Sequence, residues 1–209
     1  MDLYALVEEW PHESLVSFRE LPGCLSTGQT AEEAIQKAPE AITDYFLWLK
    51  QNKLFFLEEK ITPINVIVKE RIRADRVGPC FESELVAPTD REMMIALNVA
   101  ATARALLAEL YNDVLPAQRS CAFKPGEWSL TDHLQHILQA EAHYVGCFSD
   151  QPAEAMPRVT EAELSTRLIE NGMSYGTFLR GLTAEQRARV YIHGEAEWTA
   201  ARRLRCYGA

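Results

Sequence analysis

The chain has 209 residues, of which 47% are hydrophobic and 24% charged, so it can bury a core and does not belong to the disordered class. Its net charge of −9 is uneven, because residues 1–60 hold 11 acidic and 5 basic side chains. An acidic first segment repels phosphate backbones, so we do not expect it to bind nucleic acid directly, whereas a basic protein partner is compatible with its charge.

Residues 1–70 predict a small α+β module of order β-β-β-α-β. Residues 3–8 alternate in polarity, and residues 15–18 are β-prone. Pro22-Gly23 and Ser26-Thr27-Gly28 supply turn chemistry around Cys24, with room for a third short strand. Thr30, with Glu33 three residues later, is a capping box that opens a helix. Apolar residues recur at helical spacing as far as Leu49, and Pro39 should kink this helix. The run ITPINVIVK predicts the last strand.

Residues 71–90 contain two prolines and a glycine without a steady period, which predicts a linker over residues 71–87. From residue 88 to residue 209 the apolar period changes to that of helices. Successive helices are expected from Asp90, from a cap at Ser129 or Thr131, from Thr160, from Thr183 and from about Thr199. Helices with short connections predict an all-α, up-and-down bundle after the α+β module.

Two stretches resemble known families. Residues 18–42, FRELPGCLSTGQTAEEAIQKAPEAI, resemble the HicB-like antitoxin module through the Leu-Pro-Gly-Cys turn, the Ser-Thr-Gly step and the Thr-x-Glu-Glu-Ala helix start. This resemblance covers about residues 1–70. It implies a protein-interaction module of the kind that masks small RNA-cleaving toxins, usually with the help of a separate DNA-binding tail. We find no helix-turn-helix or basic strand arm to serve as that tail.

The second resemblance lies in the helical part. Residues 126–145, GEWSLTDHLQHILQAEAHYV, resemble the signature of the second helix of DinB-like bundles, with Trp128-Ser129, His136 and Glu141 at the matching positions. Residues 194–205, GEAEWTAARRLR, resemble the start of that family's last helix. The resemblance implies a divalent metal held by three histidines, one from the second helix and two from an HxxxH pair in the last helix.

Only His136 carries over to this chain. The sequence contains no HxxxH pair, and after Trp198 it offers arginines, Cys206 and Tyr207 before Ala209. The last helix therefore looks incomplete or truncated, and the metal site looks degenerate. Zinc or nickel would be expected in a complete relative. His133, one turn before His136, and Cys206, in the last helix, are the candidate helper ligands, but together they are too few for a structural zinc site.

No other group of residues in the sequence predicts a catalytic site. The five cysteines are scattered, without CxxC spacing, and no Gly-rich phosphate-binding loop is present. No continuous apolar run reaches about 20 residues, and the first residues carry acids where a signal peptide carries bases, so we expect a cytoplasmic protein that is not associated with a membrane.

We therefore favour a non-catalytic regulatory or protein-interaction protein, with a partner bound through the acidic N-terminal module. The alternative is a metal-dependent DinB-like thiol-transferase or hydrolase that uses His136 as one ligand. A third hypothesis is a truncated remnant, whose exposed apolar face would favour a homodimer.

Overall fold

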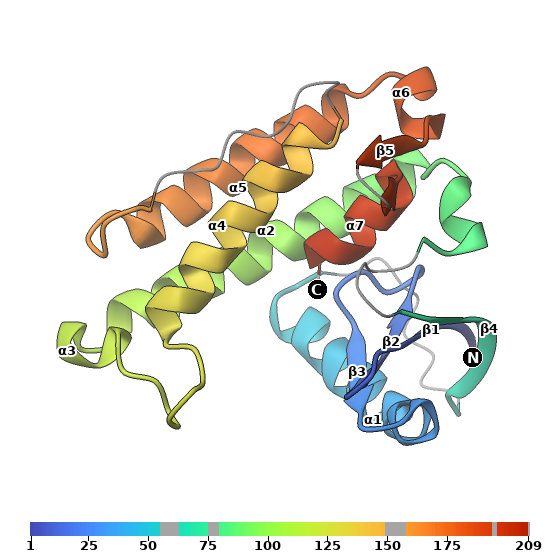
Figure 1. Cartoon of the computed structure of the whole chain (residues 1–209), viewed down its shortest axis with the longest axis horizontal. Coiled ribbons are helices and arrows are strands. Elements are labelled where there is room, and N and C mark those ends of the chain that lie inside the picture. Colours follow the sequence, from blue (N-terminus) through green and yellow to red (C-terminus); the bar gives the residue numbers. More distant parts are fainter. Residues whose placement is uncertain (55–62, 75–79, 149–157, 194–195, 209) are drawn as a thin grey trace. The chain divides into compact units, whose positions relative to one another are not determined.

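The computed structural model of the chain describes all residues except 55–62, 75–79, 149–157, 194–195 and 209 (Figure 1). Contacts divide the chain into two compact units. Unit 1 comprises Met1–Val99 and Leu182–Ala209, and unit 2 comprises Ala100–Gly181. The fold class is confirmed as α+β, with a small N-terminal sheet followed by a helical bundle. The domain boundaries at residues 70 and 88 stay a prediction.

The sheet of unit 1 has four strands in the order β3-β2-β1-β4. Strand β1 (Asp2–Glu9) pairs antiparallel with β2 (Ser14–Phe18) and parallel with the edge strand β4 (Asn65–Arg73), and β2 pairs with β3 (Leu25–Gly28). Helix α1 (Ala31–Gln51) connects β3 to β4, as a parallel pairing requires. The predicted order β-β-β-α-β is therefore correct.

Helix α1 packs on one face of this sheet (Figure 1), and it presents the small side chains of Ala31, Ala34 and Ala38 to the core. A Cβ added at Gly28 would lie 2.6 Å from the backbone nitrogen of Ala34, so only glycine fits between β3 and α1. Thr30 is the N-cap, as predicted, and its hydroxyl accepts a hydrogen bond from the Glu33 N–H at 3.2 Å. The helix continues through Pro39, and the kink expected there stays a prediction. The core of this layer consists of Leu3, Ala5, Val7, Val16, Phe18, Leu21, Cys24, Ala31, Ala34, Ala38 and Ile42.

The segment expected as a linker carries ordered structure. Strand β4 continues to Arg73, and residues Glu82–Leu85 form a 3-10 helix, η1. Phe81, directly before η1, is completely buried, whereas Leu85 is exposed. Phe81 therefore anchors η1 in unit 1.

The long helix α2 (Asp90–Asp113) begins in unit 1 and continues into unit 2. In unit 2 it is followed by α3 (Pro116–Arg119), α4 (Leu130–Gly146) and α5 (Leu164–Gly181). The core of unit 2 consists of Ala108, Tyr111, Leu134, Leu138, Leu164 and Leu168. Helix α5 begins four residues after the predicted cap Thr160, because residues 161–163 form a turn.

Helix α2 is long and apolar enough to cross a membrane by length and composition alone. Charged residues interrupt its sequence, and one of them, Arg104, is buried against a carboxylate of unit 2. Many residues of its apolar stretch are also buried. A core helix of a bundle produces the same pattern, so this helix carries no argument for a membrane.

The C-terminal part of unit 1 begins with the short helix α6 (Ala184–Ala188), which Thr183 caps as predicted. The hairpin of β5 (Tyr191–His193) and β6 (Ala196–Trp198) follows, and helix α7 (Ala200–Gly208) ends the described chain. The sequence did not predict the hairpin. The start of α7 after Thr199 agrees with the prediction.

Candidate functional site

The predicted metal residue, His136, lies on α4. Ser129 is the N-cap of this helix and forms a capping box with Asp132, whose backbone N–H donates to the Ser129 hydroxyl at 3.2 Å. Hydrogen bonds from Ser129 hold the pKa of Asp132 below its usual value. The cap fixes the first turn of α4, and so it fixes the direction of the side chains one and two turns later.

His133 and His136 both lie beside Trp128. The centroid of the Trp128 ring lies 5.4 Å from that of His133 and 4.8 Å from that of His136, both in edge-to-face geometry. All three side chains are exposed. The structure therefore brings the predicted ligand His136 and one predicted helper, His133, onto the same exposed corner of unit 2.

These residues do not form a complete divalent-metal site. A catalytic zinc site needs three protein ligands and a water, and a structural one needs four protein ligands. His133 and His136 supply two at most, and the described residues contain no cluster of three or more His, Cys, Asp or Glu side chains that could hold a metal. The side chain of the other predicted helper, Cys206, lies outside the described residues. The assignment of His136 as a ligand stays a prediction.

The glutamate of the DinB-like signature, Glu141, has a structural role in unit 2. Its side chain is 3% exposed and accepts a hydrogen bond from Arg104 Nε at 2.7 Å, while Asn171 donates to its other oxygen at 2.5 Å. Burial raises the pKa of Glu141, and the charge of Arg104 opposes that shift. Glu141 thus joins α2, α4 and α5 from inside the bundle.

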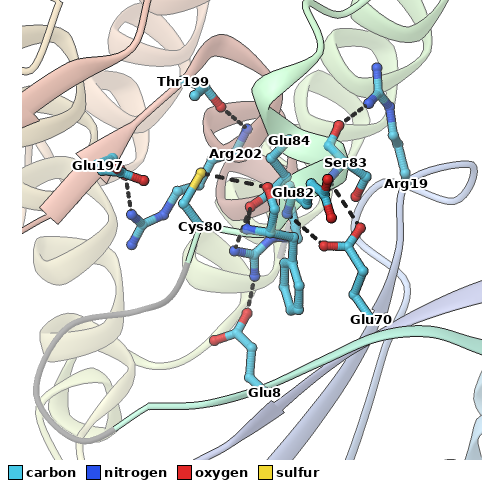
Figure 2. A network of polar contacts seen from close by, with 12 residues as sticks. Glu8, Arg19, Glu70, Cys80, Glu82, Ser83, Glu84, Glu197, Thr199 and Arg202 are labelled. Atoms are coloured by element: carbon cyan, nitrogen blue, oxygen red, sulfur yellow. Dashed lines mark hydrogen bonds and ion pairs between the residues drawn. The ribbon is translucent and has the colours of Figure 1, made fainter.

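A second polar network lies in unit 1, where α7 meets the sheet (Figure 2). Arg205 donates from Nε to Glu84 Oε1 at 2.6 Å and from one terminal nitrogen to Glu84 Oε2 at 3.4 Å. Its other terminal nitrogen pairs with Glu8 Oε1. The side chains of Arg205, Glu8 and Glu84 are 13%, 6% and 3% exposed, so this is a buried ion cluster.

The two carboxylates of this cluster are held in place by further donors. The Phe81 N–H donates to Glu84 Oε2 at 3.0 Å, and the Trp10 indole N–H donates to Glu8 Oε2 at 3.3 Å. The Arg205 guanidinium carbon also lies 5.1 Å from the Phe81 ring centroid, which is cation–π distance. Each carboxylate therefore keeps its position for the single arginine between them.

Polar contacts on either side fix η1 next to this cluster. The carboxylate of Glu70 on β4 accepts from the backbone N–H groups of Glu82 at 2.6 Å and Ser83 at 3.0 Å (Figure 2). Arg19 donates to the Ser83 carbonyl at 2.5 Å and to Glu92 at 2.6 Å. Strand β4 and the turn after β2 thus both position the helix that carries Glu84.

Cys80 lies beside this network but is not an activated nucleophile. Burial, with the nearby Glu84 charge, raises the pKa of the Cys80 thiol to about 11. With this pKa the thiol stays protonated at neutral pH, and it is therefore unreactive because the thiolate is the reactive form.

The other arginines of α7 also make contacts within unit 1. The guanidinium carbons of Arg202 and Arg203 lie 3.8 and 3.6 Å from the ring centroid of Trp198, and Arg203 is completely buried. The Arg202 backbone N–H donates to the Thr199 hydroxyl at 3.1 Å, which caps the helix. These two arginines therefore pack against Trp198 within unit 1.

The chain was compared with known proteins. Neither the protein-family models nor the curated proteins give a match. Among solved structures, YfiT from Bacillus subtilis, described as a probable metal-dependent hydrolase with an unusual four-helix bundle topology, is similar at a TM-score of 0.51 and 13% identity. The match covers 63% of this chain and 83% of that one. The likeness supports a four-helix-bundle fold for the helical part of this chain. At this identity, the likeness to YfiT concerns the fold alone.

Sequence reasoning missed the Glu8–Glu84–Arg205 cluster. Arg205 is separated from Glu84 by 121 positions and from Glu8 by 197, so no local spacing indicates the contact. Glu8 falls at a polar position of the alternation in residues 3–8, so the sequence gives no sign that its carboxylate is buried.

Proposed function

We propose that this chain is a non-catalytic regulatory or protein-interaction protein of the HicB-like and DinB-like type, with a degenerate metal site. The observation that supports this most strongly is the pairing of Arg205 in α7 with Glu8 and Glu84. By its resemblance, this is the helix that would supply the HxxxH ligand pair. Here it stabilises the N-terminal sheet through an arginine.

The form and charge of the N-terminal module support an interaction role. Its order of strands and helix is the one that the HicB-like resemblance implies, and Glu32, Glu40 and Asp44 are exposed acids along α1. A surface of this sign attracts basic proteins and raises their association rate. We therefore propose a basic protein partner and a cytoplasmic location.

The test presents the purified full chain to a small basic RNA-cleaving toxin and measures both binding and RNA cleavage. We expect binding and protection of the RNA. A variant with Glu40→Lys and Asp44→Lys should bind at least tenfold more weakly, because two attractive charges become repulsive. A matched control, Glu109→Lys with Asp113→Lys on α2, should bind like the unchanged chain. No binding by the unchanged chain, or equal weakening by both pairs, would contradict the proposed interaction surface.

The alternative function is a divalent-metal-dependent thiol-transferase or hydrolase. Two observations favour it: His133 and His136 lie together on an exposed corner, and the fold is similar to that of a probable metal-dependent hydrolase. A further ligand would then have to come from outside the described residues or from a partner subunit. When bound, such a metal would lower the pKa of a coordinated thiol or water.

Titration of the full chain with zinc or nickel distinguishes the two functions. The alternative predicts stoichiometric binding that is lost in His136→Ala and kept in His12→Ala, a control at another exposed histidine. The proposed interaction role predicts no stoichiometric binding by any of the three proteins.

A further inference from the structure

The face of the sheet opposite α1 binds a helix. Because side chains alternate along a strand, Leu3, Ala5 and Val7 of β1 point toward α1, whereas Leu6 and Glu8 point to the other face. Leu6 and Glu8 are nevertheless only 2% and 4% exposed. Together with Phe81 and Glu84, these two residues form a surface on which α7 lies, which we call the α7 docking site.

The docking site is acidic, and one arginine neutralises part of its charge. Glu8 and Glu84 supply two carboxylates, and α7 places a single guanidinium, that of Arg205, between them. A planar guanidinium pairs with a carboxylate through two parallel N–H groups, which a lysine cannot reproduce. Without α7, these two carboxylates would lose the guanidinium that lies between them. The site therefore selects a helix that carries an arginine.

Helix α7 does not fill the docking site completely. A cavity of about 30 Å³, room for about one water molecule, remains beside Arg205. On the helix side it is bounded by the short side chain of Ala201 and by Leu204. A helix with a larger apolar residue in the place of Ala201 would bury more area against Leu6 and Phe18.

We propose that the α7 docking site is a binding site for an arginine-bearing amphipathic helix of a protein partner, and that α7 competes with this partner from within the chain. This inference rests on the proposed interaction role and identifies the surface and the chemistry of the partner. A partner helix offers the same arginine and a better apolar fit. The apparent affinity for the partner is then set by the fraction of chains in which α7 is detached.

The experiment uses a labelled peptide of residues 196–208 with Cys206→Ser, added to the full-length chain. In the variant Arg205→Ala, α7 loses its pairing with Glu8 and Glu84, so the site opens while the peptide keeps its own arginine. We expect this variant to bind the peptide at least tenfold more tightly than the unchanged chain does. Adding Glu84→Gln to Arg205→Ala should remove most of that gain.

Arg71→Ala is the matched control, because Arg71 also joins two glutamates of unit 1, Glu9 and Glu32, but at the surface. It should bind the peptide no better than the unchanged chain. Circular dichroism of each variant checks that the fold is kept. If Arg205→Ala unfolds unit 1, Arg205→Lys keeps the charge without the two parallel hydrogen bonds, and it should still bind the peptide more tightly than the unchanged chain.

Equal peptide affinity of the unchanged chain and a folded Arg205 variant would overturn the inference. Equal peptide affinity of Arg205→Ala with and without Glu84→Gln would overturn it as well. A toxin or other basic partner that binds the unchanged chain and Arg205→Ala equally would keep the proposed interaction role and overturn only this site. Stoichiometric zinc binding, in contrast, would refute the proposed function while leaving a positive peptide result intact.

Discussion

Replacing Arg104 by leucine should destabilise unit 2 strongly, because it removes one partner of a buried ion pair. The side chains of Arg104 and Glu141 are 9% and 3% exposed. After the substitution, the Glu141 carboxylate would keep the Asn171 amide as its remaining described hydrogen-bond donor, at 2.5 Å. Leaving one charge buried in this way costs about 3–5 kcal/mol. That is a large part of the roughly 5–15 kcal/mol that stabilises a typical protein.

Urea denaturation followed by circular dichroism measures this loss. With a slope of about 2 kcal/mol per molar urea, the expected shift of the midpoint is about 2 M. Arg167→Leu is the control, because Arg167 pairs with Glu170 at the surface of the same unit, and exposed pairs contribute about 0–1 kcal/mol. The double variant Arg104→Leu, Glu141→Leu should be more stable than Arg104→Leu alone, since no buried charge remains.

The pH dependence gives an independent check. Burial raises the pKa of Glu141, and without Arg104 this shift should grow. The folded Arg104→Leu variant then binds a proton more readily than its unfolded chain does. Its loss of unfolding free energy relative to the unchanged chain, the stability deficit, should therefore be smallest near pH 4.5 and should increase as the pH rises above that value. A loss below about 1 kcal/mol at pH 7, or a deficit independent of pH, would refute the structural role assigned to Glu141.

Three further predictions concern unit 1 and the exposed surface. Thr30→Ala removes the N-cap of α1 and should lower the free energy of unfolding by about 1 kcal/mol, measured by urea denaturation; no loss would contradict the cap. Burial opposes ionisation of Glu92, but the hydrogen bonds from Arg19 and Thr89, with the charge of Arg19, together outweigh it and lower the pKa of Glu92. The stability difference between the unchanged chain and Glu92→Gln should therefore begin to shrink as the pH falls below about 4.5 and should vanish below the lowered pKa of the folded state. The exposed Cys121 should react with a thiol reagent long before Cys24, because burial raises the pKa of Cys24 to about 12. Mass spectrometry of the labelled chain measures the order of reaction, and labelling of Cys24 before Cys121 would contradict the prediction.

Elements whose structure depends on a few neighbouring residues could be predicted from the sequence. The caps at Thr30, Ser129 and Thr183 each involve a side chain and an N–H group three residues later, so their helix starts were predicted correctly. The β-β-β-α-β order followed from turn residues and a change of apolar period. The hairpin of β5 and β6 was missed because strands of three residues are too short to show a period of two.

Long-range pairing explains what the sequence could not predict. Glu141 and Arg104 are 37 positions apart, and Arg205 and Glu8 are 197 apart. Propensity and periodicity carry no information on which distant charges will meet. For the same reason the sequence assigned the helix after Thr199 to the bundle, by its helical period and by resemblance, whereas contacts group α7 with the sheet in unit 1. Only the packing of both faces of the sheet reveals the role of Arg205.

A chain whose last helix carries arginines, and whose described residues offer only two neighbouring histidines on α4, should not hold a catalytic divalent metal. The most direct test is the metal content of the purified full-length chain after exposure to zinc or nickel and exhaustive dialysis, measured by elemental mass spectrometry. The expected result is well below one ion per chain, with no difference between the unchanged protein and His136→Ala. One retained ion per chain that disappears in His136→Ala would instead show that His136 is a ligand of a bound metal.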